Sequence, residues 1–392
     1  MSQLNKEKNA SNPDQIYFDL QVTNAQSTTQ PPPVFSINET RDTPFILVPE
    51  DYYLSIVRFS LQTGTLPLFI PHIQPAQGDR NLTSYSVTME YENAGAAIPL
   101  TTQQTFINWI PQDLQASLPS PPSATNNGLQ NNQTGYYNCY NYQWFLYQVL
   151  QALVTCFATL DATLANYLTV TLGAVHPIIT WDTTSNTATL FFDAAWTTSP
   201  NPHIKFYMNA PLYQLFSSFV AENQGYTGIT LGRNQKIIVA DFTGANTQVL
   251  PYSPNPTLER IALYQEYSTV SSWSAITSLV FVSNTLPINP SQVSSPLIFS
   301  NGQLSSNGTN NSTTLNVITD LIGDDLQYKP YLVYTPNGSN RYISMNGNQP
   351  LKNIDISVYY KLKSGELIPY RLGSGATATL KILFARKTNT LG

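Results

Sequence analysis

Charged side chains are scarce in this 392-residue chain, and this scarcity limits the kinds of partner that it can bind. Asp, Glu, Lys and Arg make up 10% of the residues, where about 25% is usual. The net charge is −5, and no run of Lys or Arg exceeds two residues. Sequence-independent binding to nucleic acid needs clustered cations. We therefore expect no direct contact with nucleic acid, except through Lys6 and Lys8 near the N-terminus.

Cysteine and histidine are also scarce. Two cysteines, Cys139 and Cys156, are too few for a disulfide framework, and we favour two small buried apolar residues over a bridge between them. The three histidines, His72, His176 and His203, lie beside or close to proline, and none has another His, a Cys or a carboxylate at metal-ligand spacing. We expect turn or surface positions for them and no metal site.

Motifs of catalysis are missing as well. The chain has no G-x-S-x-G elbow and no phosphate-binding loop. Glu90 with Glu92 and Asp324 with Asp325 come nearest to paired carboxylates, and a solvated loop is the favoured interpretation of both. Gly373-Ser-Gly375 is expected to be a tight turn between two strands. We predict no catalytic, cofactor-binding or metal-ligating residue and no enzymatic activity, with a hydrolase on a β-scaffold as a remote alternative.

Long uninterrupted apolar runs are absent too. The first 15 residues contain no apolar segment of the kind that a signal peptide requires, so we expect the chain to be made inside the cell. The most apolar stretch, 144–172, is interrupted by Gln148, Gln151 and Asp161. These polar residues favour a buried helix over a membrane span.

The polarity that is present comes mainly from Asn, Gln, Ser and Thr, whose uncharged groups cost less to desolvate than ions. Such a surface suits a protein that its neighbours will cover. The chain also has 24 Tyr, 17 Phe and 5 Trp, and tyrosine suits both cores and interfaces. Tyr136, Tyr137, Tyr140 and Tyr142 therefore have two interpretations, an exposed cluster or an apolar lead-in to the next helix.

Short apolar runs separated by Gly, Pro and Asn predict many strands, and hence a sandwich or a barrel. In 52–60, strict alternation places Tyr52, Leu54, Ile56 and Arg58 on one face. The polar stretches 119–135 and 300–313 are predicted loops. The predicted strands are 16–23, 52–60, 83–91, 189–192, 204–208, 236–240, 258–267, 276–283, 315–320, 330–335, 341–345, 353–361 and 378–386, while 45–48 and 107–110 are shorter apolar runs.

Two helices are predicted among these strands. The first spans about 142–172, with Asn141 as its N-cap and Gly173 as its stop. The second spans 211–219 and begins with a proline, which suits a first helical turn. Its apolar residues Leu212, Leu215, Phe216 and Phe219 share one face.

The C-terminal text is the most specific part of the sequence. It consists of 353–361 (NIDISVYYK), 364–370 (SGELIPY) and 378–387 (ATLKILFARK). It resembles the ending of penton, or minor capsid, proteins of polinton-like viruses, virophages and related double-jelly-roll-lineage DNA viruses. Tyr360 stands where tryptophan is common in that family, and Tyr370 with Arg371 departs from its usual apolar pair. Matches at 43–71, 206–216 and 278–287 follow the same order, so the resemblance spans nearly the whole chain.

The resemblance implies a mainly β protein, an antiparallel jelly-roll β-sandwich with loop and helix-containing insertions. The implied organisation is a flexible arm at 1–15, a first part of the jelly roll at 16–118, an insertion region at 119–250 and a second part of the jelly roll at 251–387.

The resemblance also implies a structural role in the virion, which is made and assembled inside the host cell. The expected partners are four further copies of the chain in a pentamer at each five-fold vertex, neighbouring major capsid protein capsomers, and a host-surface glycan or receptor. No cofactor is implied. Two alternatives stay open, a trimeric double-jelly-roll major capsid protein and a carbohydrate-binding or receptor-binding β-sandwich.

Overall fold

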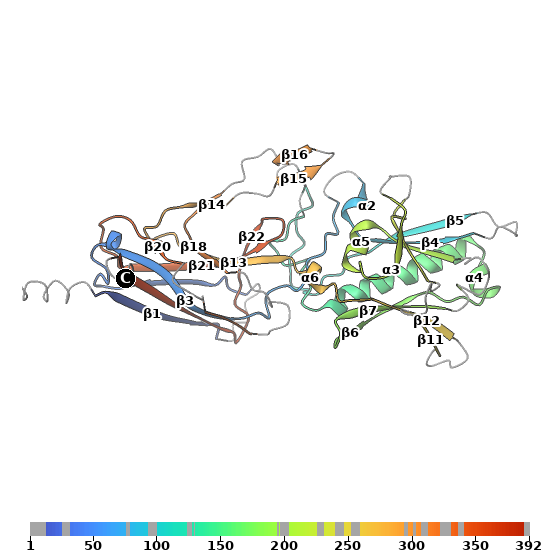
Figure 1. Cartoon of the computed structure of the whole chain (residues 1–392), viewed down its shortest axis with the longest axis horizontal. Coiled ribbons are helices and arrows are strands. Elements are labelled where there is room, and N and C mark those ends of the chain that lie inside the picture. The colour runs from blue at the N-terminus through green and yellow to red at the C-terminus, as the bar shows by residue number, and fades with distance from the viewer. Residues whose placement is uncertain are drawn as a thin grey trace, which may run out of the picture. The chain divides into compact units, whose positions relative to one another are not determined.

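The chain folds into two compact units, which we describe separately (Figure 1). Unit 1 comprises Met1–Pro67 and Ala275–Gly392, and unit 2 comprises Leu68–Ser274. The computed structural model describes residues 13–25, 32–75, 79–92, 100–123, 128, 130–193, 196, 204–225, 231–239, 247–251, 259–293, 297–300, 303–306, 313–321, 331–335 and 341–387. Most of the predicted N-terminal arm, including Lys6 and Lys8, lies outside these residues.

Unit 1 contains two antiparallel sheets of four main strands each. One has the order β1-β23-β3-β19, and β20 also pairs with β3; the other has the order β18-β13-β21-β2, and β22 also pairs with β21. The bounds are β1 Gln15–Thr23, β2 Ser36–Thr40, β3 Tyr52–Gln62, β13 Ile276–Val282, β18 Val317–Leu321, β19 Tyr331–Tyr334, β20 Ile343–Ser344, β21 Asn353–Leu362, β22 Leu367–Pro369 and β23 Thr377–Arg386. A short 3-10 helix, η1 (Pro49–Asp51), precedes β3.

This strand order is that of a jelly roll. When the eight main strands are numbered along the chain, one sheet reads 1-8-3-6 and the other reads 5-4-7-2. The inner faces are apolar because the strands alternate: in β21, Ile354, Ile356 and Val358 are buried. The sheets meet at Phe59 of β3 and Phe281 of β13, whose ring centroids lie 4.6 Å apart, edge to face. The predicted mainly β jelly-roll sandwich is confirmed.

One strand departs from strict alternation. Arg58 was expected to share a face with Tyr52, Leu54 and Ile56, but it is exposed, and Phe59 is buried instead. Lys381 pairs with Arg58 while the next residue of β23 pairs with Ile56, so β3 holds one extra residue at this point. Such a β-bulge reverses the faces that follow it, and alternation alone does not reveal it.

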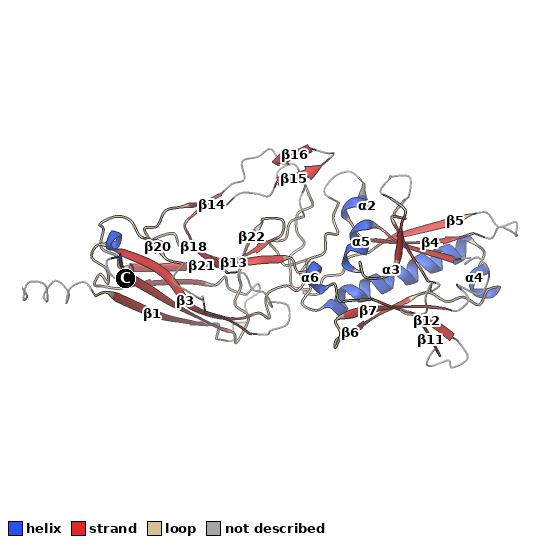
Figure 2. Cartoon of the chain, in the orientation of Figure 1, coloured by secondary structure: helices blue, strands red, loops and turns tan. Residues whose placement is uncertain are grey.

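Unit 2 packs a long helix between two antiparallel sheets (Figure 2). The sheets have the orders β5-β4-β8-β10-β9 and β11-β12-β7-β6, which differ from the jelly-roll order of unit 1. Their bounds are β4 Ser86–Tyr91, β5 Thr101–Phe106, β6 Ile178–Asp182, β7 Thr187–Asp193, β8 Ile204–Met208, β9 Ala221–Asn223, β10 Gln235–Ile237, β11 Thr247–Pro251 and β12 Glu259–Tyr264. Short helices α2 (Arg80–Thr83), α4 (Tyr167–Val170), α5 (Ala210–Leu215) and α6 (Val270–Trp273) complete the unit.

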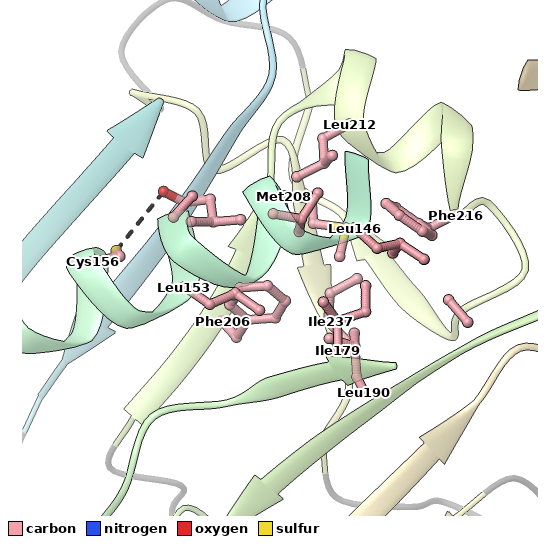
Figure 3. Packing of buried hydrophobic residues seen from close by; sticks show 14 of the residues in the cluster. Leu146, Leu153, Cys156, Ile179, Leu190, Phe206, Met208, Leu212, Phe216 and Ile237 are labelled. Atoms are coloured by element: carbon pink, nitrogen blue, oxygen red, sulfur yellow. Dashed lines mark hydrogen bonds between the residues drawn. The ribbon is translucent and has the colours of Figure 1, made fainter. Parts of the chain in front are cut away.

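The long helix, α3 (Tyr142–Thr163), contributes much of the core of unit 2. Leu146 and Leu153 pack among side chains from both sheets, including Phe206 of β8 and Leu190 of β7 (Figure 3). By length and composition alone, α3 would suffice to cross a membrane. Its residues belong instead to the main buried cluster of the unit, which confirms the predicted buried helix.

The predicted span of this helix, 142–172, was too long. The helix begins at the expected N-cap, where Asn141 accepts a hydrogen bond from the Trp144 N–H. It ends at Thr163, because Ala165 and Asn166 both adopt left-handed conformations (φ 52° and 64°) just after its C-cap Leu164. The buried Asp161 carboxylate then accepts hydrogen bonds from the backbone N–H of Leu168 and Thr169, which fixes the start of α4 as a separate turn.

The second predicted helix was also too long. The segment 211–219 contains α5, Ala210–Leu215, followed by two tight turns in which the Phe216 N–H bonds the Tyr213 carbonyl and the Phe219 N–H bonds the Phe216 carbonyl. The cap is Asn209, whose side chain accepts a hydrogen bond from the Leu212 N–H. All four apolar residues predicted for its inner face are buried.

The remaining differences concern polar or short segments. The short apolar runs 45–48 and 107–110 contain no strand, and Ile46 makes only an isolated bridge to Leu351. The predicted loop 300–313 contains part of a hairpin formed by β15 (Leu297–Ser300) and β16 (Gln303–Ser306). A further pair joins β14 (Ser291–Val293) to β17 (Thr313–Leu315). The described parts of 119–135 hold neither helix nor strand.

The boundaries expected for the insertion, 119 and 250, differ from those of unit 2. Strand β4 and its partner β5 lie before residue 119, yet β4 pairs with β8 in the first sheet of unit 2. Strand β12 lies beyond residue 250 and pairs with β7 in the second sheet. The compact insertion therefore runs from Leu68 to Ser274.

Replacing Asp161 with alanine should destabilise unit 2. The Asp161→Ala variant leaves the buried N–H of Leu168 without its acceptor, so we expect the free energy of unfolding to fall by about 1–3 kcal/mol. Urea denaturation measures this change. Asp182→Ala, which removes a comparable turn contact at the surface, is the control and should change stability much less. Equal effects of the two variants would contradict the assigned role of Asp161.

Candidate assembly surfaces

The histidines form no site among the described residues. His72 and His176 are half-buried and far apart in sequence, and burial lowers the pKa of His72. His203 lies outside the described residues, as do Asp324 and Asp325. Within the described part of the chain, no group of three or more His, Cys, Asp or Glu residues is arranged to hold a metal ion.

Both cysteines are buried and free, as predicted. The Cys156 thiol donates a hydrogen bond to the Gln103 carbonyl at 3.2 Å, and burial raises its pKa to about 11. Burial raises the pKa of Cys139 as well. Since the thiolate is the reactive form, both thiols are expected to be unreactive in the folded protein.

The tyrosine cluster before α3 belongs to the core. Tyr137 and Tyr142 are buried, and Tyr136 and Tyr140 are half-buried. The Tyr142 ring lies 5.4 Å from that of Trp273, edge to face. Of the two interpretations of this segment, the apolar lead-in to the helix is therefore right.

Glu90 contradicts the prediction of a solvated loop. It lies on β4, and only 3% of it is exposed. Its carboxylate accepts a hydrogen bond from Lys205 at 3.2 Å and is ion-paired with Arg233. The Tyr207 hydroxyl donates to the same carboxylate at 3.3 Å. The charge is therefore buried only because three donors from β8 and from the turn before β10 surround it.

The balance of these contacts is reflected in the pKa of Glu90. Burial alone would raise it, but the hydrogen bonds and charges of Lys205 and Arg233 hold it below the ordinary value of 4.5. Lys205 has a second partner, Glu92, at 2.8 Å. Every charge in this group is thus compensated within unit 2, which indicates a structural cluster that fixes β4 to β8.

A second buried carboxylate organises a corner of unit 1. Asp355 of β21 accepts hydrogen bonds from the Ser283 hydroxyl (2.5 Å), the Asn284 N–H (2.8 Å) and the Thr285 N–H (2.9 Å). The Ser283 oxygen in turn accepts from the Leu286 N–H at 2.9 Å. These contacts turn the chain sharply after β13 and keep the pKa of Asp355 low although burial would raise it. Ser283 and Asp355 both belong to segments that carry the family resemblance, and the structure brings them together.

The predicted turn at Gly373–Gly375 is confirmed. Gly375 has a positive φ of 71°, and its N–H donates to the Asn24 carbonyl at 2.8 Å. The Asn24 side chain donates to the Leu372 carbonyl at 2.9 Å. This turn leads into β23 and joins its start to the end of β1.

Large exposed apolar side chains remain on both units. In the described part of unit 1 they are Tyr17, Val34, Leu47, Tyr331 and Val333. In unit 2 the most exposed are Leu114, Leu118 and Val170. Exposed apolar groups that cluster mark surfaces for protein contacts.

Comparison with known proteins agrees with these features. A family model described as Sputnik minor capsid protein V18/19 matches residues 16–386. The chain is 31% identical over 166 residues to "Uncharacterized protein V18" of Sputnik virophage, which covers 41% of this chain and 93% of that protein. It is 28% identical over 217 residues to "Structural protein V19" of the same virophage, covering 55% and 96% respectively.

Two solved structures are similar over almost the whole chain. A chain from the cryo-EM structure of the Sputnik virophage superposes with a TM-score of 0.74 at 27% identity, covering 96% of this chain and 99% of that one. The mavirus penton protein superposes with a TM-score of 0.60 at 15% identity, covering 95% and 99%. At 15% sequence identity, the similarity to the mavirus penton protein shows a shared fold alone.

The Glu90 cluster should make the stability of unit 2 sensitive to acid. Because the folded-state pKa of Glu90 is lowered, its stabilising contribution is present above pH 4.5 and is lost as the pH falls through that lower pKa. Glu90→Gln should cost about 2–4 kcal/mol at neutral pH and weaken the acid dependence. The control is Glu92→Gln, since Glu92 is half-exposed and should contribute less than about 1 kcal/mol. Denaturation at several pH values measures both, and equal profiles for the two variants would refute the assignment.

The Asp355 corner should matter for unit 1 in the same way. Asp355→Ala leaves the Ser283 hydroxyl and two backbone N–H groups without their acceptor, so we expect a loss of about 2–4 kcal/mol in the free energy of unfolding. Ser357→Ala on the same strand removes only an exposed hydroxyl contact and serves as the control. The idea fails if chemical denaturation gives both variants the stability of the unsubstituted protein.

Proposed function

Because the chain belongs to the family of the Sputnik minor capsid protein V18/19 and is therefore a structural protein of the virion, we propose that it is the penton subunit, five copies of which form a ring at each five-fold vertex of an icosahedral capsid. The observation that carries this proposal is the single jelly roll of unit 1, in the strand order that the two sheets display. Its likeness to the mavirus penton protein supports the same assignment of fold.

A ring of five sets a physical requirement on the subunit. Each copy must contact its neighbour through two different surfaces, because a cyclic ring of this kind is heterologous. A stable contact buries more than about 1,000 Å² in total. A sandwich provides two outer sheet faces and two lateral edges for such contacts, and the low charge content lowers the cost of covering them.

The alternative of a trimeric double-jelly-roll major capsid protein finds no support in unit 2. That unit places α3 between two sheets whose strand orders differ from those of unit 1. A chain built from two jelly rolls would repeat the same order. We therefore favour a penton with an inserted second unit, in contact with neighbouring major capsid protein capsomers.

We also propose that the protein acts by assembly without catalysis. The most deeply buried carboxylate with cationic partners, Glu90, is fully engaged by Lys205 and Arg233. Asp355 is likewise occupied by the groups that form its corner. Both carboxylates hold strands in place, which is the role expected of them in a capsid protein.

The oligomeric state tests the proposal directly. Native mass spectrometry and light scattering of the full chain, under the ionic conditions of capsid assembly, should give a complex of five subunits of 43.5 kDa. The complex should be favoured by higher protein concentration, as mass action requires. A trimer would support the double-jelly-roll alternative, and a strictly monomeric protein would refute assembly by this chain alone.

A further inference from the structure

The outer face of the sheet β1-β23-β3-β19 is exposed along β1 and β19 and at Arg58, whereas Ser55, Ser60 and Leu383 on its inner strands are buried. Phe18 and Leu20 of β1 point into the core, whereas Tyr17, Asp19 and Gln21 alternate with them and are exposed. The strand register extends this outer face across the sheet. Residues that pair across the strands form rows on this face. The first row holds Asp19, Lys381 and Arg58, and the second holds Gln21, Thr379, Ser60 and Val333. At the next position along the strands, Thr23 pairs with Thr377, and Gln62 pairs with Tyr331.

Polar groups on this face are already paired with one another. Arg58 is ion-paired with Asp19 at 3.0 Å across β23, and Lys381 lies 5.1 Å from the centre of the Tyr17 ring. The hydroxyls of Ser60 and Thr379 are 2.5 Å apart, and those of Thr23 and Thr377 are 3.1 Å apart. A partner that covers the face therefore leaves few polar groups unsatisfied, which keeps the cost of desolvation low.

Apolar side chains lie at both edges of the same face. Tyr17 on β1 is 51% exposed, and Tyr331 and Val333 on β19 are 46% and 58% exposed. They are three of the five large apolar residues that the described part of unit 1 exposes. Tyrosine is enriched where proteins meet, because it combines apolar area with a hydroxyl group. The face thus combines exposed apolar groups with one ion pair and one lysine that lies over a tyrosine ring.

Its area fits a protein contact. Three strands of about nine residues and the four residues of β19, with strands about 4.8 Å apart and about 3.3 Å per residue, give a face of about 500 Å². A matching area on a partner brings the total to about 1,000 Å², which is the minimum expected of a specific interface. A second copy of the chain can supply such a partner, since each copy in a ring offers a different surface to each neighbour.

Building on the proposed pentamer, we infer that the outer face of the sheet β1-β23-β3-β19 is the surface by which one copy docks against a different surface of the next copy in the ring. Its paired hydroxyls and the Asp19–Arg58 ion pair can be covered without counter-charges on the neighbour, while Lys381 keeps its contact with the Tyr17 ring. Tyr17, Tyr331 and Val333 supply the apolar contacts.

Two lysines introduced on this face test the inference. Gln21→Lys and Val333→Lys place unpaired charges at the two ends of one row, where burial would be costly, so each should raise the dissociation constant of the ring about tenfold or more. Light scattering against concentration measures this, and circular dichroism checks that the fold is retained. Leu47→Lys is the matched control, because Leu47 is 44% exposed but lies in the connection between β2 and η1.

Chemical labelling gives a second measurement that does not depend on a destabilising charge. Single cysteines at Gln21→Cys and Val333→Cys should react with a maleimide in dissociated subunits and be protected in the ring. The native Cys139 and Cys156 are buried and provide a low background. Leu47→Cys should react equally in both states.

The outcomes separate this inference from the proposed pentamer. A pentamer that persists in the lysine variants and leaves both introduced cysteines reactive would overturn the docking face while the penton assignment stands. Dissociation by Leu47→Lys to the same degree would also overturn it, because the effect would not be specific to the face. If the unsubstituted chain forms no ring at all, the proposed function fails first and the inference fails with it.

Discussion

Burial between the two sheets of unit 1 is the constraint on which the rest of the molecule depends. Each sheet has one apolar face, and that face is stable only when it is packed against the other, as the contact of Phe59 with Phe281 shows. Because the inner faces are buried against each other, the outer faces and edges are the surfaces left for assembly. The bulge in β3 affects both the core and the outer face, because Phe59 points inward while Arg58 points outward and pairs with Asp19. A local irregularity therefore sets both a core contact and the charge balance of the outer face.

The buried carboxylates Glu90 and Asp355 show how polar groups are accommodated in such a low-charge protein. Asp355 is satisfied mainly by backbone N–H groups and a hydroxyl of one corner, so it shapes the chain without a cation. Glu90 requires Lys205 and Arg233 from other elements, so it joins strands that are distant in sequence. Both arrangements compensate the charge locally. Local compensation is compatible with a capsid role, in which large surfaces must be covered by neutral contacts.

The sequence was informative where a residue's own neighbours determine its environment. The alternating apolar residues of 353–361 and 378–386 predicted β21 and β23 to within one residue at each end. It was uninformative where the determining contact is distant. The polar segment 101–106 forms β5 because β4 lies beside it, and Glu90 is buried because Lys205 and Arg233 reach it. The early end of α3 depends on the reach of Asp161 to Leu168 and Thr169, for which the apolar pattern carries no signal.

Unit 2 can be inserted into the jelly roll because it buries its own apolar surface and replaces only one connection between strands. The chain leaves the jelly roll after β3 and re-enters it just before β13, so the insertion replaces a single connection between two strands. A connection can lengthen greatly at small entropic cost, because the cost of closing a loop grows only with the logarithm of its length. The insertion must then bury its own apolar surface, which it does by packing α3 between two sheets. Since neither core borrows strands from the other, unit 2 can diverge in sequence without disturbing the register of β3 with β23, on which the outer face of the jelly roll depends.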